Sequence, residues 1–72
     1  MANVVDARGL SCPQPVLMTL DEIKKLNSGQ IEILVDTDTS KENVSRAAES
    51  QGWKVVDIQA EAQGYRIIIE KD

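Results

Sequence analysis

The chemistry available to this chain centres on Cys12, the only cysteine among its 72 residues. Cys12 lies in the run Gly9-Leu10-Ser11-Cys12-Pro13-Gln14-Pro15. An apolar pattern with three- and four-residue spacing follows this run and is typical of one face of a helix, through Val16, Leu17, Leu20, Ile23 and Leu26. Proline is tolerated in the first turn of a helix. We therefore predict a helix from about Pro13 to Leu26, with the thiol at or just before its N-terminus.

A thiol in that place is expected to ionise readily. Free N–H groups and the positive end of the helix dipole favour the thiolate and lower the cysteine pKa from about 8.5. Two registers fit: Cys12 is the N-cap and Pro13 the first helical residue, or the helix begins at Pro15 and the thiol feels a weaker field. A lone cysteine is more often a buried apolar residue. Cys12 lies outside the apolar pattern, however, so we favour a functional thiol.

The residue types that are missing narrow the chemistry further. The chain has no histidine and no second cysteine, which excludes Cys-His and Ser-His-Asp catalysis, CxxC redox pairs and metal sites built on histidine or cysteine. The oxygen-bearing side chains near Asp36 lack the glycine and final glutamate of a calcium loop, and no glycine-rich phosphate loop occurs. We therefore expect no cofactor and no metal. A single thiol can still accept sulfur as a persulfide and pass it on.

Charge and composition suggest the kind of partner. Twelve acidic and eight basic residues give a net charge of −4, which argues against nucleic-acid binding by a basic face and suits docking onto basic proteins. One cysteine cannot form an intramolecular disulfide, and no stretch resembles a secretory leader or a membrane span. We expect a cytoplasmic monomer that contacts neither nucleic acid nor membrane directly.

The pattern of apolar residues predicts the order βαβαββ in one domain, residues 1–72. Strands are expected near 4–5, 31–35, 53–60 and 65–70, and a second helix follows Thr39, which has capping-box spacing with Glu42. The inner face of that helix is predicted to be Val44, Ala47, Ala48 and Gln51, and Gly52 is predicted to end it. The predicted fold class is α+β: a two-layer α/β sandwich with a mixed four-stranded sheet and two helices on one face. Leu34 or Ile68 is expected on the opposite, partly exposed face.

The segment around the thiol resembles the opening signature of the TusA/SirA-like family of sulfur carrier proteins. Residues 6–17 read D-A-R-G-L-S-C-P-Q-P-V-L and contain the CPxP motif of that family. The similarity extends over nearly the whole chain, through Gly29, the strand 33–36, Gly52 and the closing strand 65–71. The resemblance implies a sulfurtransferase-like carrier rather than a self-contained enzyme. Cys12 would hold a persulfide and relay it from a cysteine desulfurase or another donor protein to a downstream acceptor protein.

The resemblance also suggests roles for the neighbours of Cys12. Pro13 and Pro15 would fix the helix start and expose the thiol, and Gly9 would allow a tight or positive-φ turn. Arg8 either stabilises the thiolate or persulfide anion or is a solvated loop arginine. Asp6 is expected to fix the loop by hydrogen bonding, because a carboxylate beside a thiolate would raise its pKa.

The sequence is compatible with more than one pathway and more than one class of protein. The Cys-Pro-Gln-Pro-Val-Leu variant is similar to the amino-terminal domain of the YedF-like branch, which is linked to selenium metabolism and usually has a second domain. tRNA thiolation, relay to other sulfur pathways and selenium handling therefore all remain open. The competing class is a regulatory or adaptor module in which Cys12 is incidental. A small RNA-binding domain is disfavoured by the charge and by the scarcity of aromatic residues.

Overall fold

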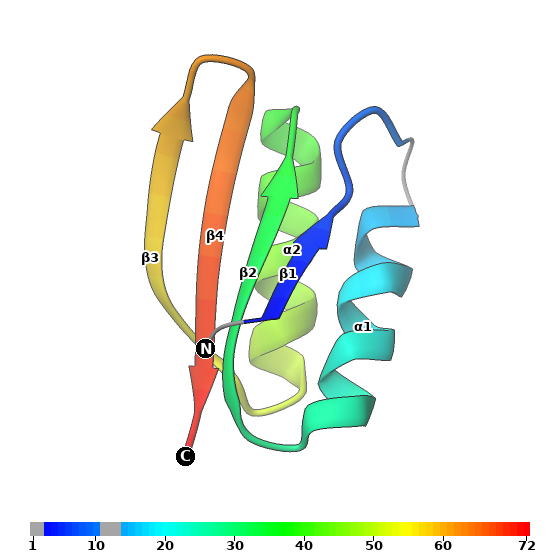
Figure 1. Ribbon diagram of the computed structural model, residues 1–72, viewed down its shortest axis with the longest axis vertical. Coiled ribbons are helices and arrows are strands. Elements are labelled where there is room, and N and C mark those ends of the chain that lie inside the picture. The colour runs from blue at the N-terminus through cyan, green and yellow to red at the C-terminus, as the bar shows by residue number, and fades with distance from the viewer. Residues whose placement is uncertain (1–2, 11–13) are drawn as a thin grey trace.

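The computed structural model describes residues 3–10 and 14–72, and the elements follow the predicted order βαβαββ. One mixed sheet has the strand order β1 (Asn3–Asp6), β2 (Gly29–Val35), β4 (Gly64–Lys71) and β3 (Lys54–Glu61). The helices α1 (Gln14–Leu26) and α2 (Asp38–Ser50) both lie on one side of this sheet (Figure 1). The fold is therefore the predicted α+β sandwich of two layers.

The sheet is mixed because its connections differ in kind. β1 and β2 are parallel and are joined through α1, as a crossover connection requires, whereas β3 and β4 form an antiparallel hairpin. The central strands β2 and β4 also pair antiparallel, with Ile31 opposite Ile69 and Ile33 opposite Ile67. These four isoleucines are fully buried beneath the helices. The middle of the sheet therefore supplies most of the apolar surface that the helices cover.

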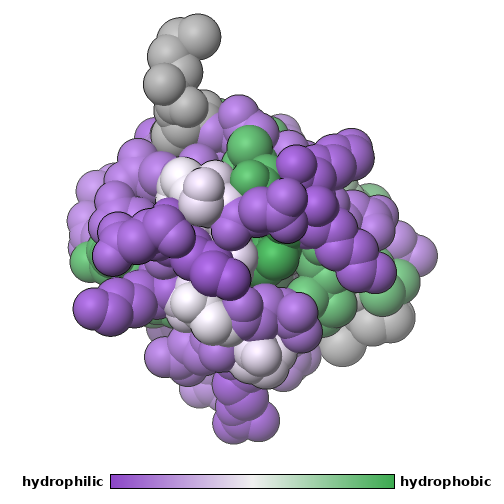
Figure 2. Space-filling view, turned by 90° about the horizontal axis from the view of Figure 1, so that it is seen from below, coloured by the Kyte–Doolittle hydropathy of each residue, from purple (hydrophilic) through white to green (hydrophobic). Residues whose placement is uncertain are grey.

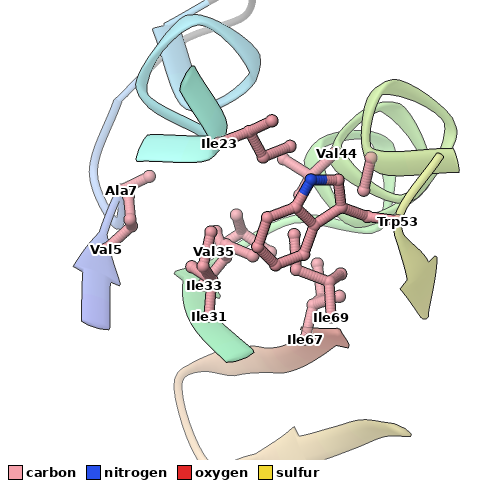
Figure 3. Packing of buried hydrophobic residues seen from close by; sticks show 11 residues of the cluster. Val5, Ala7, Ile23, Ile31, Ile33, Val35, Val44, Trp53, Ile67 and Ile69 are labelled. Atoms are coloured by element: carbon pink, nitrogen blue, oxygen red, sulfur yellow. The ribbon is translucent and has the colours of Figure 1, made fainter. Parts of the chain in front are cut away.

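Trp53 fills the space between the helices and the sheet, although it lies outside any strand. Its side chain is only 2% exposed, and its indole reaches over the isoleucines of the central strands (Figure 3). The predicted strand began at this residue, but β3 begins at Lys54. The backbone N–H of Trp53 instead donates to the carbonyl of Ala48 at 3.0 Å, while Gly52 takes a φ of 83°. This is the C-terminal cap that the sequence predicts at Gly52.

The start of α2 corrects the sequence prediction. The N-cap is Thr37 rather than Thr39, since Thr37 is extended and its side-chain oxygen accepts the N–H of Ser40 at 3.1 Å. The helix therefore begins two residues early. Ser40 is buried on its inner face together with Val44 and Ala48, as the sequence predicts for the latter two. Gln51 was expected on that face but is exposed beyond the end of the helix.

The buried stripe of α1 is also shifted from its predicted position. Pro15, Thr19 and Ile23 are buried at four-residue spacing, whereas Leu17 is 49% exposed. Thr19 belongs to the stripe because its hydroxyl donates to the carbonyl of Pro15 at 2.9 Å, which satisfies a polar group that burial would otherwise penalise. Thr19 is therefore a polar residue at a core position, which the periodicity of apolar residues does not predict.

The other face of the sheet has no helix over it. Leu34 and Ile68 are half-buried there, as predicted for this face. On the same face Arg66, which pairs with Leu34 across the strands, contacts two carboxylates. Its Nη1 is 3.0 Å from Glu32 and its Nε is 3.3 Å from Glu61. This face of the sheet therefore carries ion pairs between neighbouring strands as well as apolar side chains.

Strand β3 forms one edge of the sheet and is irregular. Its pairing with β4 shifts register between Val55 and Asp57, so Val56 is an extra residue in the strand and is 47% exposed. An extra residue of this kind is a β-bulge, which bends the strand and increases its twist.

The end of the molecule away from the β3–β4 hairpin is covered mainly by hydrophilic side chains, with smaller apolar areas between them (Figure 2). Among residues 3–10 and 14–72, neither helix is long and apolar enough to cross a membrane.

Candidate functional site

The loop between β1 and α1 leads to residues 11–13, the thiol segment, which contains Cys12. Hydrogen bonds anchor this loop at successive residues. The N–H of Ala7 donates to the carbonyl of Leu34 at 2.8 Å, which extends the contact between β1 and β2. Gly9 has a φ of 77°, a conformation that favours glycine, as predicted. Its N–H donates to Oδ2 of Asp36 at 2.7 Å. The chain is thus tied to the end of β2 on its way toward Cys12.

Asp6, the last residue of β1, and Arg8 in the loop form a bidentate ion pair. Nε and Nη2 of Arg8 each lie 2.9 Å from a different carboxylate oxygen of Asp6, and the backbone N–H of Arg8 lies 3.2 Å from the first of them. These hydrogen bonds lower the pKa of Asp6 to about 2 and raise that of Arg8. Glu61 and Asp36 add to the negative field at the guanidinium. Arg8 is therefore neither a free cation nor a merely solvated one, and Asp6 holds the loop by hydrogen bonding.

The Asp6 carboxyl should titrate near pH 2 rather than near its ordinary value of 3.8. Because its folded-state pKa is depressed, the pair should stabilise the fold above about pH 3.8 and lose this contribution as pH falls through about 2. NMR titration of the carboxyl carbon measures the midpoint. Arg8→Gln removes the charged donors and should return the midpoint toward 3.8. An unchanged midpoint in that variant would show that Arg8 is not the cause.

Of the remaining predicted site residues, the structure describes Pro15 alone. Pro15 is fully buried, so it packs into the core as well as shaping the first turn of α1. Gln14 is already helical, so the register in which the helix begins at Pro15 is wrong. Cys12 and Pro13 lie outside the described residues, and so does the alternative in which Cys12 is the N-cap.

The β3–β4 hairpin lies at the same end of the sheet as this loop (Figure 1). Arg8, Val35 and hairpin residues 61–65 line a shallow hollow of about 220 Å³. Gly64 approaches β2 so closely that a Cβ there would lie 2.1 Å from the carbonyl oxygen of Val35. The hairpin is therefore pressed against the end of β2, from which Asp36 extends.

Tyr65 fastens the same hairpin to the start of α2. Its hydroxyl donates to Asp38, which raises the pKa of Tyr65. Lys41 lies with its Nζ 4.5 Å from the centre of the Tyr65 ring, a cation–π contact, and 3.7 Å from Asp38. Three elements, β2, α2 and the hairpin, thus meet around Asp36.

Sequence reasoning missed two residues of this edge. From the sequence, Asp36 is considered only as part of the strand 33–36 and of a calcium loop. Residues 61–64 indicate only a hairpin connection with Gly64 late in the loop. The contact of Asp36 with Gly9 joins residues 27 apart in the chain. The predicted topology could have indicated the contact, because the parallel pairing of β1 with β2 brings the C-terminal ends of both strands to the same end of the sheet.

A βαβαββ sandwich in which a CPxP segment leads into the first helix is the architecture of a sulfurtransferase of the TusA type. The family described as "Sulfurtransferase TusA" matches residues 3–71. The chain therefore belongs to the TusA/SirA-like family of sulfur carrier proteins.

Individual relatives agree with this assignment. A provisionally named sulfur carrier protein of Methanocaldococcus jannaschii is 37% identical over 68 residues, covering 93% of this chain and 91% of the relative. The YedF protein of Escherichia coli K12, also provisionally named a sulfur carrier, is 34% identical over 77 residues, covering 99% of this chain and 100% of YedF. The crystal structure of a SirA-like protein from Desulfitobacterium hafniense superposes with a TM-score of 0.82 at 27% identity, covering 94% and 93% of the two chains.

The YedF comparison bears on the number of domains in that branch. A second domain was expected to be usual in that branch, but the Escherichia coli relative is matched over its whole length. A YedF-like protein can therefore consist of this one domain.

Proposed function

We propose that this protein is a sulfur carrier that accepts sulfur as a persulfide on Cys12 and relays it to a partner protein. The observation that supports the proposal most directly is the position of the only thiol within the CPxP segment of a chain that matches the family over residues 3–71. Residues 1–72 would act as one domain in this relay. Asp6, Arg8, Gly9, Pro13 and Pro15 would support the thiol.

The reaction is two successive exchanges between sulfur atoms. The Cys12 thiolate attacks the outer sulfur of a persulfide on the donor, the S–S bond of the donor breaks, and the donor leaves as a thiolate. The acceptor nucleophile then attacks the outer sulfur on Cys12, and the Cys12 thiolate leaves. Each step forms one bond to sulfur and breaks one, so neither step needs an external oxidant or reductant.

The described residues support this chemistry by shaping the approach to the thiol. Gly9 is anchored to Asp36, and Asp6 and Arg8 hold each other, so the chain enters the thiol segment from a fixed direction. The partners would be a cysteine desulfurase or another sulfur donor protein and a downstream acceptor protein, and the net charge of −4 suits basic surfaces on them. A cytoplasmic location is proposed because a thiol that must stay free needs a reducing compartment.

Loading by a donor tests the proposal. Incubated with a cysteine desulfurase, its pyridoxal phosphate and cysteine, the protein should gain one sulfur atom, and a reductant should remove it because a persulfide is open to thiolate attack. Intact-mass spectrometry before and after the reductant measures both steps. Several desulfurases are needed, since docking is partner-specific. If none loads this protein while an established family carrier loads in parallel, the carrier function is wrong for this chain.

The same assay separates sulfur from selenium pathways. Selenocysteine replaces cysteine as the substrate of a desulfurase that accepts both. Gain of one selenium atom at a rate matching or exceeding that of sulfur would support selenium handling. Loading with sulfur alone would favour tRNA thiolation or another sulfur relay, and transfer onward to a tRNA-modifying acceptor would distinguish these two.

A further inference from the structure

We infer that Asp36 is a positioning residue for sulfur transfer: by accepting the Gly9 N–H, it holds the loop that leads to Cys12 in its working orientation. This inference rests on the proposed function. Gly9 is three residues before Cys12 in the chain. Its N–H lies 2.7 Å from Oδ2 of Asp36, a short distance that is typical of a hydrogen bond to a charged acceptor.

Asp36 holds the loop through a side chain that comes from a distant part of the sequence. The pair of Asp6 with Arg8 joins residues only two apart in the chain, at the end of β1. The contact of Ala7 with Leu34 continues the β1–β2 pairing through the main chain. Among the described hydrogen bonds of residues 7–10, only the one from Gly9 to Asp36 reaches a side chain that is distant in the sequence. This hydrogen bond therefore ties Gly9, three residues before Cys12, to the residue that directly follows β2.

The backbone of Asp36 is itself held firmly. The hairpin packs so closely that a Cβ on Gly64 would lie 2.7 Å from the Cα of Asp36. On the other side, Thr37 caps α2 and fixes the chain that follows. Because this backbone is fixed, the Asp36 carboxylate loses little conformational freedom when it accepts the Gly9 N–H. The hydrogen bond therefore fixes the position of the loop relative to the end of β2.

A direct electrostatic action of Asp36 on the thiol would have the opposite sign. A carboxylate near a thiolate disfavours the anion, so its removal would lower the thiol pKa. Loss of a positioning contact would instead release the thiol from the predicted field at the start of α1 and move its pKa up toward that of free cysteine. The two actions can therefore be separated by the direction of one measured shift.

Two substitutions at Asp36 make the test. Asp36→Ala removes the acceptor and the charge, while Asp36→Asn removes the charge and keeps an acceptor oxygen. Asp57→Ala is the matched control, because Asp57 is an exposed carboxylate on the open sheet face with a hydrogen bond to Gln59. Three quantities are measured for each: the rate of persulfide loading, the pH midpoint of iodoacetamide alkylation, and the melting temperature.

We expect Asp36→Ala to slow loading about tenfold or more, since small misplacements of reacting groups cost factors of this size. Its alkylation midpoint should rise toward that of free cysteine. Asp36→Asn and Asp57→Ala should stay within about twofold of the natural protein, as expected for changes that keep the contact or lie away from it. Asparagine as slow as alanine, or a lowered midpoint in both Asp36 variants, would overturn the inference. A lowered melting temperature with unchanged loading and midpoint would also overturn it.

The alkylation series needs no partner protein. If no desulfurase loads even the natural protein, the proposed carrier function fails, and the midpoints still decide whether Asp36 orients the thiol segment. If the natural protein loads and Asp36→Ala loads equally well, the carrier function stands and the role of Asp36 fails.

Discussion

Cys12→Ser should abolish the gain of sulfur from every donor tested, with little change in the melting temperature. The substitution exchanges one sulfur atom for oxygen, and a serine hydroxyl can neither attack a persulfide as a thiolate nor hold the outer sulfur in an S–S bond. Intact-mass spectrometry after incubation with a desulfurase measures the loss, and thermal unfolding followed by circular dichroism checks the fold. Sulfur gained by the serine variant would place the acceptor elsewhere in the chain.

The same variant separates a carrier from an adaptor. A carrier without its thiol should still bind its donor in a pull-down and lose the transfer, because docking uses surface around the thiol as well as the thiol itself. An adaptor should keep both binding and biological function. Complementation of a strain that lacks this protein, using Cys12→Ser, therefore decides between the two classes: restored growth would support the adaptor.

Gly64→Ala should destabilise the fold more than any other single methyl group added at a glycine of this chain. Its Cβ would lie 2.1 Å from the carbonyl oxygen of Val35 and 2.7 Å from the Cα of Asp36, both far inside normal contact. The φ of 142° is also one that residues with a side chain rarely adopt. Overpacking and backbone strain each cost about 1–3 kcal/mol, so a loss of about 3 kcal/mol or more is expected.

Urea unfolding measures this loss, and Gly29→Ala is its matched control. Gly29 also has a positive φ, 114°, but a Cβ there meets no atom within 4 Å. The control therefore carries the backbone strain without the steric clash. Equal losses in the two variants would show that Gly64 is needed for its φ alone and that the hairpin does not press on β2.

The sequence predicted the fold well because the elements carry their own periodicity. The alternation of Ile31, Ile33 and Val35 marks β2, and apolar residues at three- and four-residue spacing mark both helices. The errors lie where local rules compete. Thr37 and Thr39 are both acceptable N-caps, and the choice depends on which hydroxyl meets a free N–H in three dimensions.

The site was less predictable because its contacts are not local. The sequence indicated that Gly9 allows a positive φ and that Asp6 fixes the loop by hydrogen bonding. It gave no sign that Asp36 accepts the Gly9 N–H or that Gly64 presses on the same residue, since these contacts depend on how the strands end at one edge. The type and setting of Cys12 indicated a functional thiol, but the contact of Asp36 with the loop was found only in the structure.

The bulge in β3 bears on how this protein behaves at high concentration. A free edge strand is a template on which further chains can add as in amyloid, and β3 presents eight residues at such an edge. Its extra residue, Val56, breaks the regular spacing of backbone N–H and C=O groups, and Asp57 follows it at once with a charge. A second molecule cannot continue the ladder across this break without losing hydrogen bonds. We therefore expect the irregularity to disfavour fibril formation, and deleting Val56 would expose an uninterrupted edge.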